Sequence, residues 1–236
     1  MEVVGLSDLG LKRRKNEDAY LINESWGLYV ICDGMGGHRG GDVASQLAIK
    51  TINDCFEKDS SEKNINLLNH AVHQANEVIW EQGYTNPEWH EMGTTVTAAL
   101  INGLNLEIAH VGDSGCYLFR AKEINRITRD HTLAQEMVDQ GIIKTNEKRL
   151  SSYNHILTRA LGVERQVLVD NYELELLKGD LLLLCSDGLS DMLEESDMLN
   201  IITGFEDDLN KTASILLQQA LERGGFDNIS LILIRI

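Results

Sequence analysis

The sequence predicts an α+β fold, with helices and antiparallel strands in a single domain of residues 1–236. Two observations lead to this prediction. Apolar residues recur at helical spacing over residues 42–56 and 64–84. From residue 93 the period changes to that of strands, and Asn102-Gly103 is a strong hairpin turn between residues 94–101 and 104–111. Because no linker rich in proline, glycine or serine interrupts the chain, we expect one domain.

Local patterns place the remaining elements in order along the chain. Residues 19–23 and 27–32 are predicted as a strand pair, and a polar loop at residues 58–63 joins the two long helices. Further strands are expected at residues 116–120, 124–127, 167–177, 181–185 and 229–236, and further helices at 133–140, 193–203 and 209–221. Thr132 and Asp130 are alternative caps for the helix at 133. Residues 141–156 are polar and irregular, which is typical of a mobile excursion over a site.

Composition and charge argue against several classes of function. The chain has 37 acidic and 21 basic residues and a net charge of −16, so neither nucleic acid nor an anionic membrane is expected as a partner. No signal-peptide pattern and no membrane-length apolar run is present. The four cysteines include no C-x-x-C pair, which favours a reduced, cytoplasmic protein without a zinc site.

Aspartates next to glycines recur where apolar strands begin or end. Three follow apolar runs, in Cys32-Asp33-Gly34, Val111-Gly112-Asp113 and Cys185-Ser186-Asp187-Gly188, and Asp227 precedes the last strand. Each one alone is explained by an ordinary Asp-Gly turn. Together they favour one site, because carboxylates that converge at neighbouring strand ends repel each other unless a cation lies among them. Oxygen ligands suit magnesium or manganese, so we expect a hard-cation site of one or two metals.

The chain offers no protein nucleophile in a known motif. It has no G-x-S-x-G, no Cys-x5-Arg phosphate loop and no Walker loop. Two metals a few ångströms apart activate a water and clamp a phosphoryl or carboxyl oxygen. The residues therefore favour hydrolysis by direct attack of metal-activated water.

Seven short motifs follow one another over almost the whole chain. In order they are Asp8-x-Gly10-x-x-Arg13-x-x-Asn16-Glu17-Asp18, Asp33-Gly34-Met35-Gly36-Gly37-His38, Gly93-Thr94-Thr95, Gly112-Asp113-Ser114, Leu157-Thr158-Arg159-Ala160-Leu161-Gly162, Cys185-Ser186-Asp187-Gly188-Leu189 and Gly224-Gly225-x-Asp227-Asn228. Each is weak alone. In this order the chain resembles the metal-dependent protein serine/threonine phosphatases, the PPM or type 2C family, in its bacterial form.

The resemblance implies a four-layer α-β-β-α sandwich, in which two antiparallel sheets are flanked by helices and hold a binuclear manganese or magnesium centre. Asp33 would bridge the two metals, the Gly34 carbonyl would bind one, and Asp187 and Asp227 would bind the other. These three aspartates would be the catalytic residues, acting through metal-bound water. The segment near residues 130–160 corresponds to the variable flap of the family.

The resemblance also assigns supporting roles. Glu17 or Asp18 would act mostly through metal-bound water, and Arg13 would hold the substrate phosphate. Asp113 with Asp187 matches the position of a third, weaker metal in bacterial relatives. These assignments complete the set of site residues that the sequence predicts.

Two positions depart from the pattern of the family. Eukaryotic members have a proton-donating histidine just after the Asp-Gly, where this chain has Met35. His38 does not align with it, so metal-bound water is expected to protonate the leaving oxygen, with His38 as an alternative. Many relatives have arginine after Gly-Asp-Ser, where this chain has Gly115; a local salt bridge or a substrate contact is expected to be lost there.

The resemblance implies Mn/Mg-dependent hydrolysis of phosphoserine and phosphothreonine in proteins, opposing a protein kinase in bacterial signalling. The expected partners are phosphoprotein substrates and a cognate serine/threonine kinase, and the protein is expected to be a cytoplasmic monomer. One alternative is a catalytically silent phosphatase fold that regulates by docking; the intact metal aspartates argue against it. A second alternative is a metal hydrolase that acts on a small phosphoester.

Overall fold

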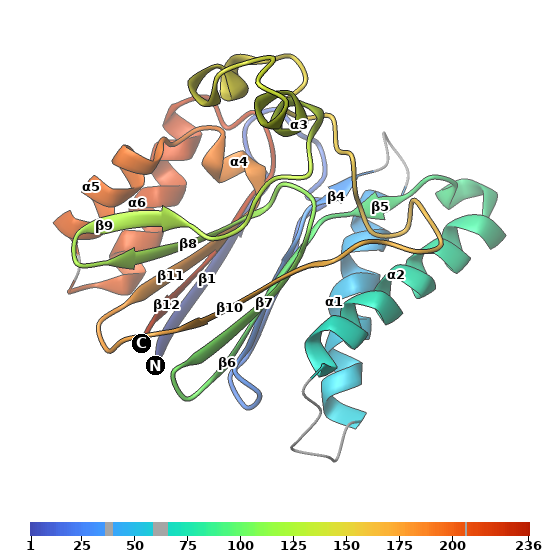
Figure 1. Cartoon of the computed structure of the whole chain (residues 1–236), viewed down its shortest axis with the longest axis horizontal. Helices are drawn as coiled ribbons and strands as arrows, with labels where there is room; N and C mark the ends of the chain where they lie inside the picture. The colour runs from blue at the N-terminus through green and yellow to red at the C-terminus, as the bar shows by residue number, and fades with distance from the viewer. Residues whose placement is uncertain (36–39, 59–65, 206) are drawn as a thin grey trace.

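Two five-stranded antiparallel sheets form the centre of the molecule in the computed structural model, which describes residues 1–35, 40–58, 66–205 and 207–236 (Figure 1). The first sheet has the order β1 (Glu2–Asp8), β12 (Ile229–Arg235), β11 (Leu181–Cys185), β8 (Gly115–Arg120) and β9 (Glu123–Arg126). The second has the order β10 (Asp170–Glu175), β7 (Asn105–Val111), β6 (Val96–Asn102), β3 (Leu28–Cys32) and β2 (Ala19–Asn23). A separate short ladder joins β4 (Gly34–Met35) to β5 (Gly93–Thr94).

Helices cover the outer face of each sheet (Figure 1). Helices α1 (Gly41–Lys58) and α2 (Leu67–Thr85) pack on the second sheet, and α5 (Glu195–Gly204) and α6 (Leu209–Glu222) pack on the first. The shorter helices are α3 (Leu133–Asp139), α4 (Asp187–Ser190) and the 3-10 turns Pro87–Trp89 and Thr145–Leu150. This arrangement confirms the expected α+β, four-layer α-β-β-α sandwich.

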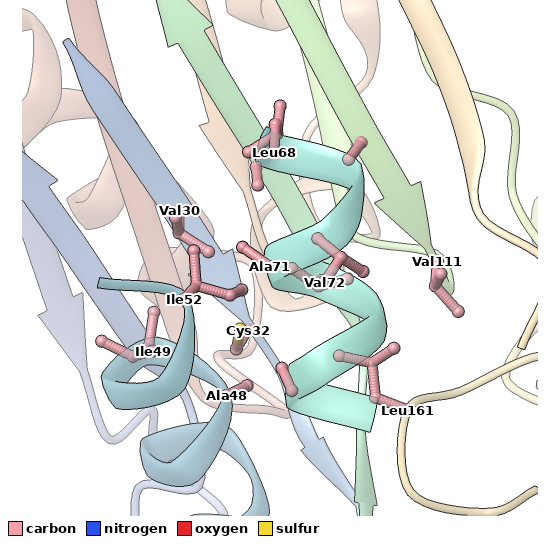
Figure 2. Close-up of a cluster of buried hydrophobic side chains, with 14 of the residues drawn as sticks. Val30, Cys32, Ala48, Ile49, Ile52, Leu68, Ala71, Val72, Val111 and Leu161 are labelled. Carbon is pink, nitrogen blue, oxygen red and sulfur yellow. The ribbon is translucent and has the colours of Figure 1, made fainter. Parts of the chain in front are cut away.

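Successive side chains of the central strands point to opposite faces of their sheet, and they contribute to three separate hydrophobic cores. On β3, Val30 and Cys32 face α1 and α2 (Figure 2), whereas Tyr29 and Ile31 lie between the sheets. Strand β11 divides in the same way between the core under α5 and α6 and the core between the sheets. Both faces of these strands are therefore buried, which explains their uninterrupted apolar sequences. Each fully buried Val, Leu or Ile side chain contributes about 1.5–3 kcal/mol.

The strand register brings four aspartates that lie next to strand ends to one end of the sandwich. These positions, Asp33, Asp113, Asp187 and Asp227, are called the aspartate corners below. Cys185 at the end of β11 pairs with Gly115 at the start of β8, and with Leu231 near the start of β12. Asp187 lies two residues after the end of β11. It is therefore close to Asp113, which precedes β8, and to Asp227, which precedes β12. The end of β3 meets this group from the opposite sheet, because the sheets face each other.

Most predicted elements are present, with small shifts at their ends. Strand β10 is shorter than residues 167–177, because Val167 and Val169 pack against the core under α1 and α2 instead of joining the sheet ladder. Strand β1 and helix α4 were not predicted. Thr132 is the cap of α3, since its hydroxyl accepts a hydrogen bond from the Gln135 N–H.

The polar segments predicted at residues 141–156 and 58–63 lie outside the two sheets. Part of the polar segment at 141–156 forms the 3-10 turn at Thr145–Leu150, and Arg149 donates to the Asp191 carbonyl oxygen. The predicted loop at 58–63 and the first residues of the predicted helix at 64 lie mostly outside the described residues. Among the described residues, no helix combines the length and the apolar character needed to cross a membrane.

Candidate metal centre

A cavity of about 970 Å³ opens where the aspartate corners meet. The predicted site residues that line it are Arg13, Glu17, Asp33, Gly34, Asp113, Asp187 and Asp227. Asp18 is buried next to it, where its Oδ2 accepts a hydrogen bond of 2.8 Å from the Ser186 hydroxyl. The structure thus brings predicted residues from four separate parts of the chain to one place.

The backbone of Asp33 is held by two threonines at the junction of β5 and β6. The Thr94 hydroxyl and the Thr95 N–H both donate to the Asp33 carbonyl oxygen, at 2.8 and 2.9 Å. The Asp33 N–H donates to the Thr95 hydroxyl at 2.9 Å. The Thr94-Thr95 pair therefore fixes the position of the carboxylate that follows β3.

Gly34 is required by close packing of three backbone segments. A Cβ at this position would lie 2.2 Å from the Gly41 carbonyl oxygen at the start of α1, and 2.5 Å from the Glu17 carbonyl oxygen. The Gly34 N–H also donates to that Glu17 oxygen at 3.2 Å. The glycine therefore seats the Glu17 loop and α1 against the Asp33 corner. The role of its carbonyl as a metal ligand stays a prediction.

Asp187 and Asp227 are joined by a second close approach. Asp187 is the first residue of α4, and a Cβ on the next residue, Gly188, would lie 2.0 Å from the Asn228 carbonyl oxygen. Arg13 donates to Asp227 Oδ2 at 2.5 Å, and its side chain is 49% exposed. The arginine predicted to hold phosphate therefore lies at the cavity mouth, paired with a predicted metal ligand.

Two buried carboxylate oxygens fit a cation. Among the described residues, Oδ1 of Asp18 and Oδ1 of Asp187 are buried without a hydrogen-bond donor. Buried polar atoms of this kind are rare in native proteins, and a bound ion is one explanation for them. The ligand chemistry is also consistent, since carboxylates and carbonyls suit Mg²⁺ and Mn²⁺.

The electrostatics of the cavity also favour a bound cation. Burial, reinforced by the neighbouring carboxylates, holds the pKa of Asp33 and of Asp113 well above its usual range. Burial raises the pKa of Asp18 to about 7, with the charges of Asp187 and Asp227 adding to the shift. The pKa of Asp227 is also raised by burial, although Arg13 opposes the shift. A divalent cation would relieve this repulsion.

Sequence reasoning missed His155 and Asp191. His155 Nδ1 lies 3.8 Å from Asp187 Oδ2 and 3.3 Å from Asp191 Oδ2, and the three side chains could share one metal ion. The Asp187 and Asp191 carboxylates raise the pKa of His155 to about 9, and burial, followed by the charge of Asp187, raises that of Asp191 to about 6. The four-residue spacing from Asp187 to Asp191 was the available signal, because it places both on one face of a helical turn.

The two departures from the family pattern have structural counterparts. Met35 lines the cavity, and His38 lies outside the described residues. At Gly115 a Cβ would lie 2.6 Å from the Tyr117 ring. Arg126 packs over that ring and donates to the Asp113 carbonyl oxygen at 3.1 Å. An arginine from the neighbouring strand therefore contacts the Asp113 corner.

Known proteins resemble this chain over almost its whole length. The family described as Protein phosphatase 2C matches residues 12–223. Serine/threonine phosphatase stp of Listeria welshimeri is 33% identical over 235 residues, which cover 97% of this chain and 93% of the relative. The crystal structure of the serine/threonine phosphatase PstP/Ppp of Mycobacterium tuberculosis is 35% identical, with a TM-score of 0.92 and coverage of 100% of this chain and 98% of that one.

A second solved structure contains metal. The catalytic domain of PstP in complex with two manganese ions is 35% identical to this chain, with a TM-score of 0.88. The alignment covers 98% of this chain and 96% of that one.

Proposed function

The chain belongs to the protein phosphatase 2C family, and on that premise we propose that it hydrolyses phosphoserine and phosphothreonine in proteins with manganese or magnesium in the aspartate cavity. The observation that carries the proposal is the convergence of Asp33, Asp187 and Asp227 on one cavity with buried, unpartnered carboxylate oxygen nearby. The seven ordered motifs and the full-length match to serine/threonine phosphatases support the same reaction.

Each predicted ligand has a proposed task. Asp33, the Gly34 carbonyl, Asp187 and Asp227 would hold two metals, with Asp33 shared between them, and Glu17 or Asp18 would act mostly through water. Asp113 with Asp187 would hold a third, weaker ion. When bound, the metals supply an activated water and neutralise charge on the phosphoryl oxygens.

Arg13 is proposed to bind the substrate phosphate. Its guanidinium lies at the cavity mouth, where it can present two N–H groups to a phosphate as a charge-assisted fork. We expect Arg13→Ala to raise KM for a phosphopeptide by about tenfold or more, a loss of roughly 1.4 kcal/mol. Steady-state kinetics with Arg13→Lys as the matched variant, which keeps the charge but not the fork, would separate geometry from charge. An unchanged KM in Arg13→Ala would refute the role.

The reaction itself is tested by metal removal and substrate class. Hydrolysis of a phosphothreonine peptide should stop with chelator and return with manganese. Turnover of small phosphoesters but not of any phosphopeptide would favour the small-ester alternative. No turnover of either, with metal present, would favour the silent docking protein.

We further propose that the protein opposes a serine/threonine kinase in bacterial signalling, as a cytoplasmic monomer. Its four unpaired cysteines support a reducing compartment. A phosphoproteome comparison between the wild-type strain and an Asp33→Asn strain tests the role, since phosphoserine and phosphothreonine sites of kinase substrates should accumulate in the mutant.

A further inference from the structure

A second, smaller groove adjoins the catalytic cavity. It has a volume of about 200 Å³, and its lining combines the apolar residues Met35, Leu157, Ala160, Val163, Val167 and Leu168 with the polar residues Thr158, Arg159, Glu164 and Gln166. Met35 and Leu157 line both the groove and the catalytic cavity, so the two spaces adjoin each other. In Figure 1 the chain that leads from α3 to β10 passes beside β4 and β5, which carry the Asp33 corner.

A buried asparagine holds the loop that forms one wall of the groove. Asn76 of α2 is 2% exposed, and its amide donates to the carbonyl oxygens of Glu164 and Arg165, both at 3.1 Å. Its side-chain oxygen accepts the Gly162 N–H at 2.9 Å. The loop that carries Val163 is therefore ordered without a ligand, which reduces the entropic cost of binding.

The groove is also fixed relative to the Asp33 corner. Thr94 and Leu161 exchange two backbone hydrogen bonds, at 2.8 and 3.1 Å. The same Thr94 donates its hydroxyl to the Asp33 carbonyl oxygen. A substrate whose phosphate reaches the metal centre therefore meets the groove at a constant offset.

The volume of the groove and the charged residues in its lining limit which chemical group can bind there. Small-molecule pockets are roughly 300–1,000 Å³, and this groove is smaller, so it suits a single side chain. The arginine in its lining, Arg159, is paired with Asp170 at 2.8 Å. The other charged residue of the lining, Glu164, would repel an acidic group.

We propose that this groove receives an apolar side chain of the phosphoprotein substrate, from a residue close in sequence to the phosphorylated one. The inference rests on the proposed phosphatase function and names the substrate class of the same site. Leu168 is 74% exposed and Val163 is 49% exposed in the absence of a substrate. Covering them with an apolar side chain removes their surface from water, so the enzyme should prefer phosphopeptides with leucine or a similar residue at one flanking position.

The test uses phosphothreonine peptides of alanine in which a single leucine is moved through the flanking positions. We expect kcat/KM to rise about tenfold over the all-alanine peptide at one position, and to fall when aspartate replaces leucine there. Leu168→Asp should bring the leucine-to-alanine ratio near one. Leu177→Asp is the matched control, because Leu177 is 50% exposed and lies beyond the opposite end of β10, so the ratio should persist.

The ratio within each variant is unaffected by a general loss of activity, and thermal melting verifies that both variants fold. Hydrolysis of all the peptides without any positional preference would overturn the groove and leave the phosphatase function standing. A preference that survives Leu168→Asp would also overturn it. If neither the peptides nor para-nitrophenyl phosphate were hydrolysed with manganese present, the proposed function would fail, and the groove with it.

Discussion

At the scale of single residues, Asp33 is the carboxylate whose burial and repulsion by its neighbours a bound metal would offset. Its carboxylate sits among Asp18, Asp187, Asp113 and Asp227, and these charges add to burial in raising its pKa. In the absence of metal the site therefore destabilises the ionised form of Asp33, while the two threonines hold its backbone in place.

Asp33→Asn should consequently abolish activity and leave the fold intact. We expect kcat/KM on a phosphopeptide to fall by more than about 100-fold, because even residues that only orient metal ligands cost 10–100-fold when replaced. Without metal, the variant should melt at or above the wild-type temperature, since asparagine cannot carry the charge that burial and the neighbouring carboxylates disfavour. Asp54→Asn, on the surface of α1 and 3.6 Å from Lys58, is the control and should keep full activity. Full activity of Asp33→Asn would contradict its role as a ligand.

His110 offers a residue-scale test that does not involve the metal ligands. It is fully buried, its Nε2–H donates to the Arg129 carbonyl oxygen, and its Nδ1 is hydrogen-bonded to the Thr97 hydroxyl oxygen. Burial, with the charges of His131 and Arg126, lowers its pKa to about 3. The imidazole therefore stays neutral in the fold at pH values where the unfolded chain, with an ordinary pKa near 6.5, becomes protonated.

The sign of the pH effect follows from this difference. The folded pKa lies below the unfolded one, so the contribution of His110 is fully present above about pH 6.5 and is lost as pH falls from there toward 3. Relative to His110→Gln, the wild-type free energy of unfolding should drop by about 1.4 kcal/mol per pH unit in that window. Urea unfolding of both proteins with chelator present measures it, and a difference that does not change with pH would rule out a neutral buried His110.

At the scale of elements, predictability from the sequence depends on how many faces of a strand or helix are covered. Strands β3 and β11 were predicted because both faces are buried and the apolar run is uninterrupted. Helix α4 could not be predicted, since four residues are too short to show a period. Asp191 and its contact with His155 also escaped notice: the four-residue spacing from Asp187 to Asp191 indicates a shared face only once a helical turn is assigned there. The Gly34 and Gly188 contacts involve backbone from distant segments, which no local pattern reports.

Gly188 makes the contact between α4 and the start of β12 a testable element. A Cβ at Gly188 would overlap the Asn228 carbonyl oxygen, so Gly188→Ala must push α4 away from β12 and separate Asp187 from Asp227. We expect a loss of about 1–3 kcal/mol in the free energy of unfolding, together with weaker manganese binding by calorimetry. Gly204→Ala at the end of α5 is the matched control, because its Cβ would enter open space, and it should be neutral or stabilising. Unchanged metal affinity in Gly188→Ala would show that the ligand pair does not depend on this contact.

At the scale of the whole molecule, the proposed metal centre would join the two sheets. Asp33 follows β3 of the second sheet, whereas Asp187 and Asp227 adjoin β11 and β12 of the first. The chain also carries a net charge of −16, and Glu17, Asp33, Asp113, Asp187 and Asp227 line one cavity at this end of the sandwich. A cation bound there would stabilise the fold by linking the sheets and by offsetting this local repulsion.

Manganese should therefore raise the melting temperature of the protein, and chelator should lower it. At a concentration one hundred times the dissociation constant, one bound ion adds about 2.7 kcal/mol, or roughly 5–10 °C for a chain of this size. Asp33→Asn and Asp187→Asn each remove a ligand from one sheet, so each should lose most of the shift, while Asp54→Asn should keep it. A shift of equal size in all three variants would place the stabilising ion elsewhere in the protein and would separate metal binding from the aspartate cavity.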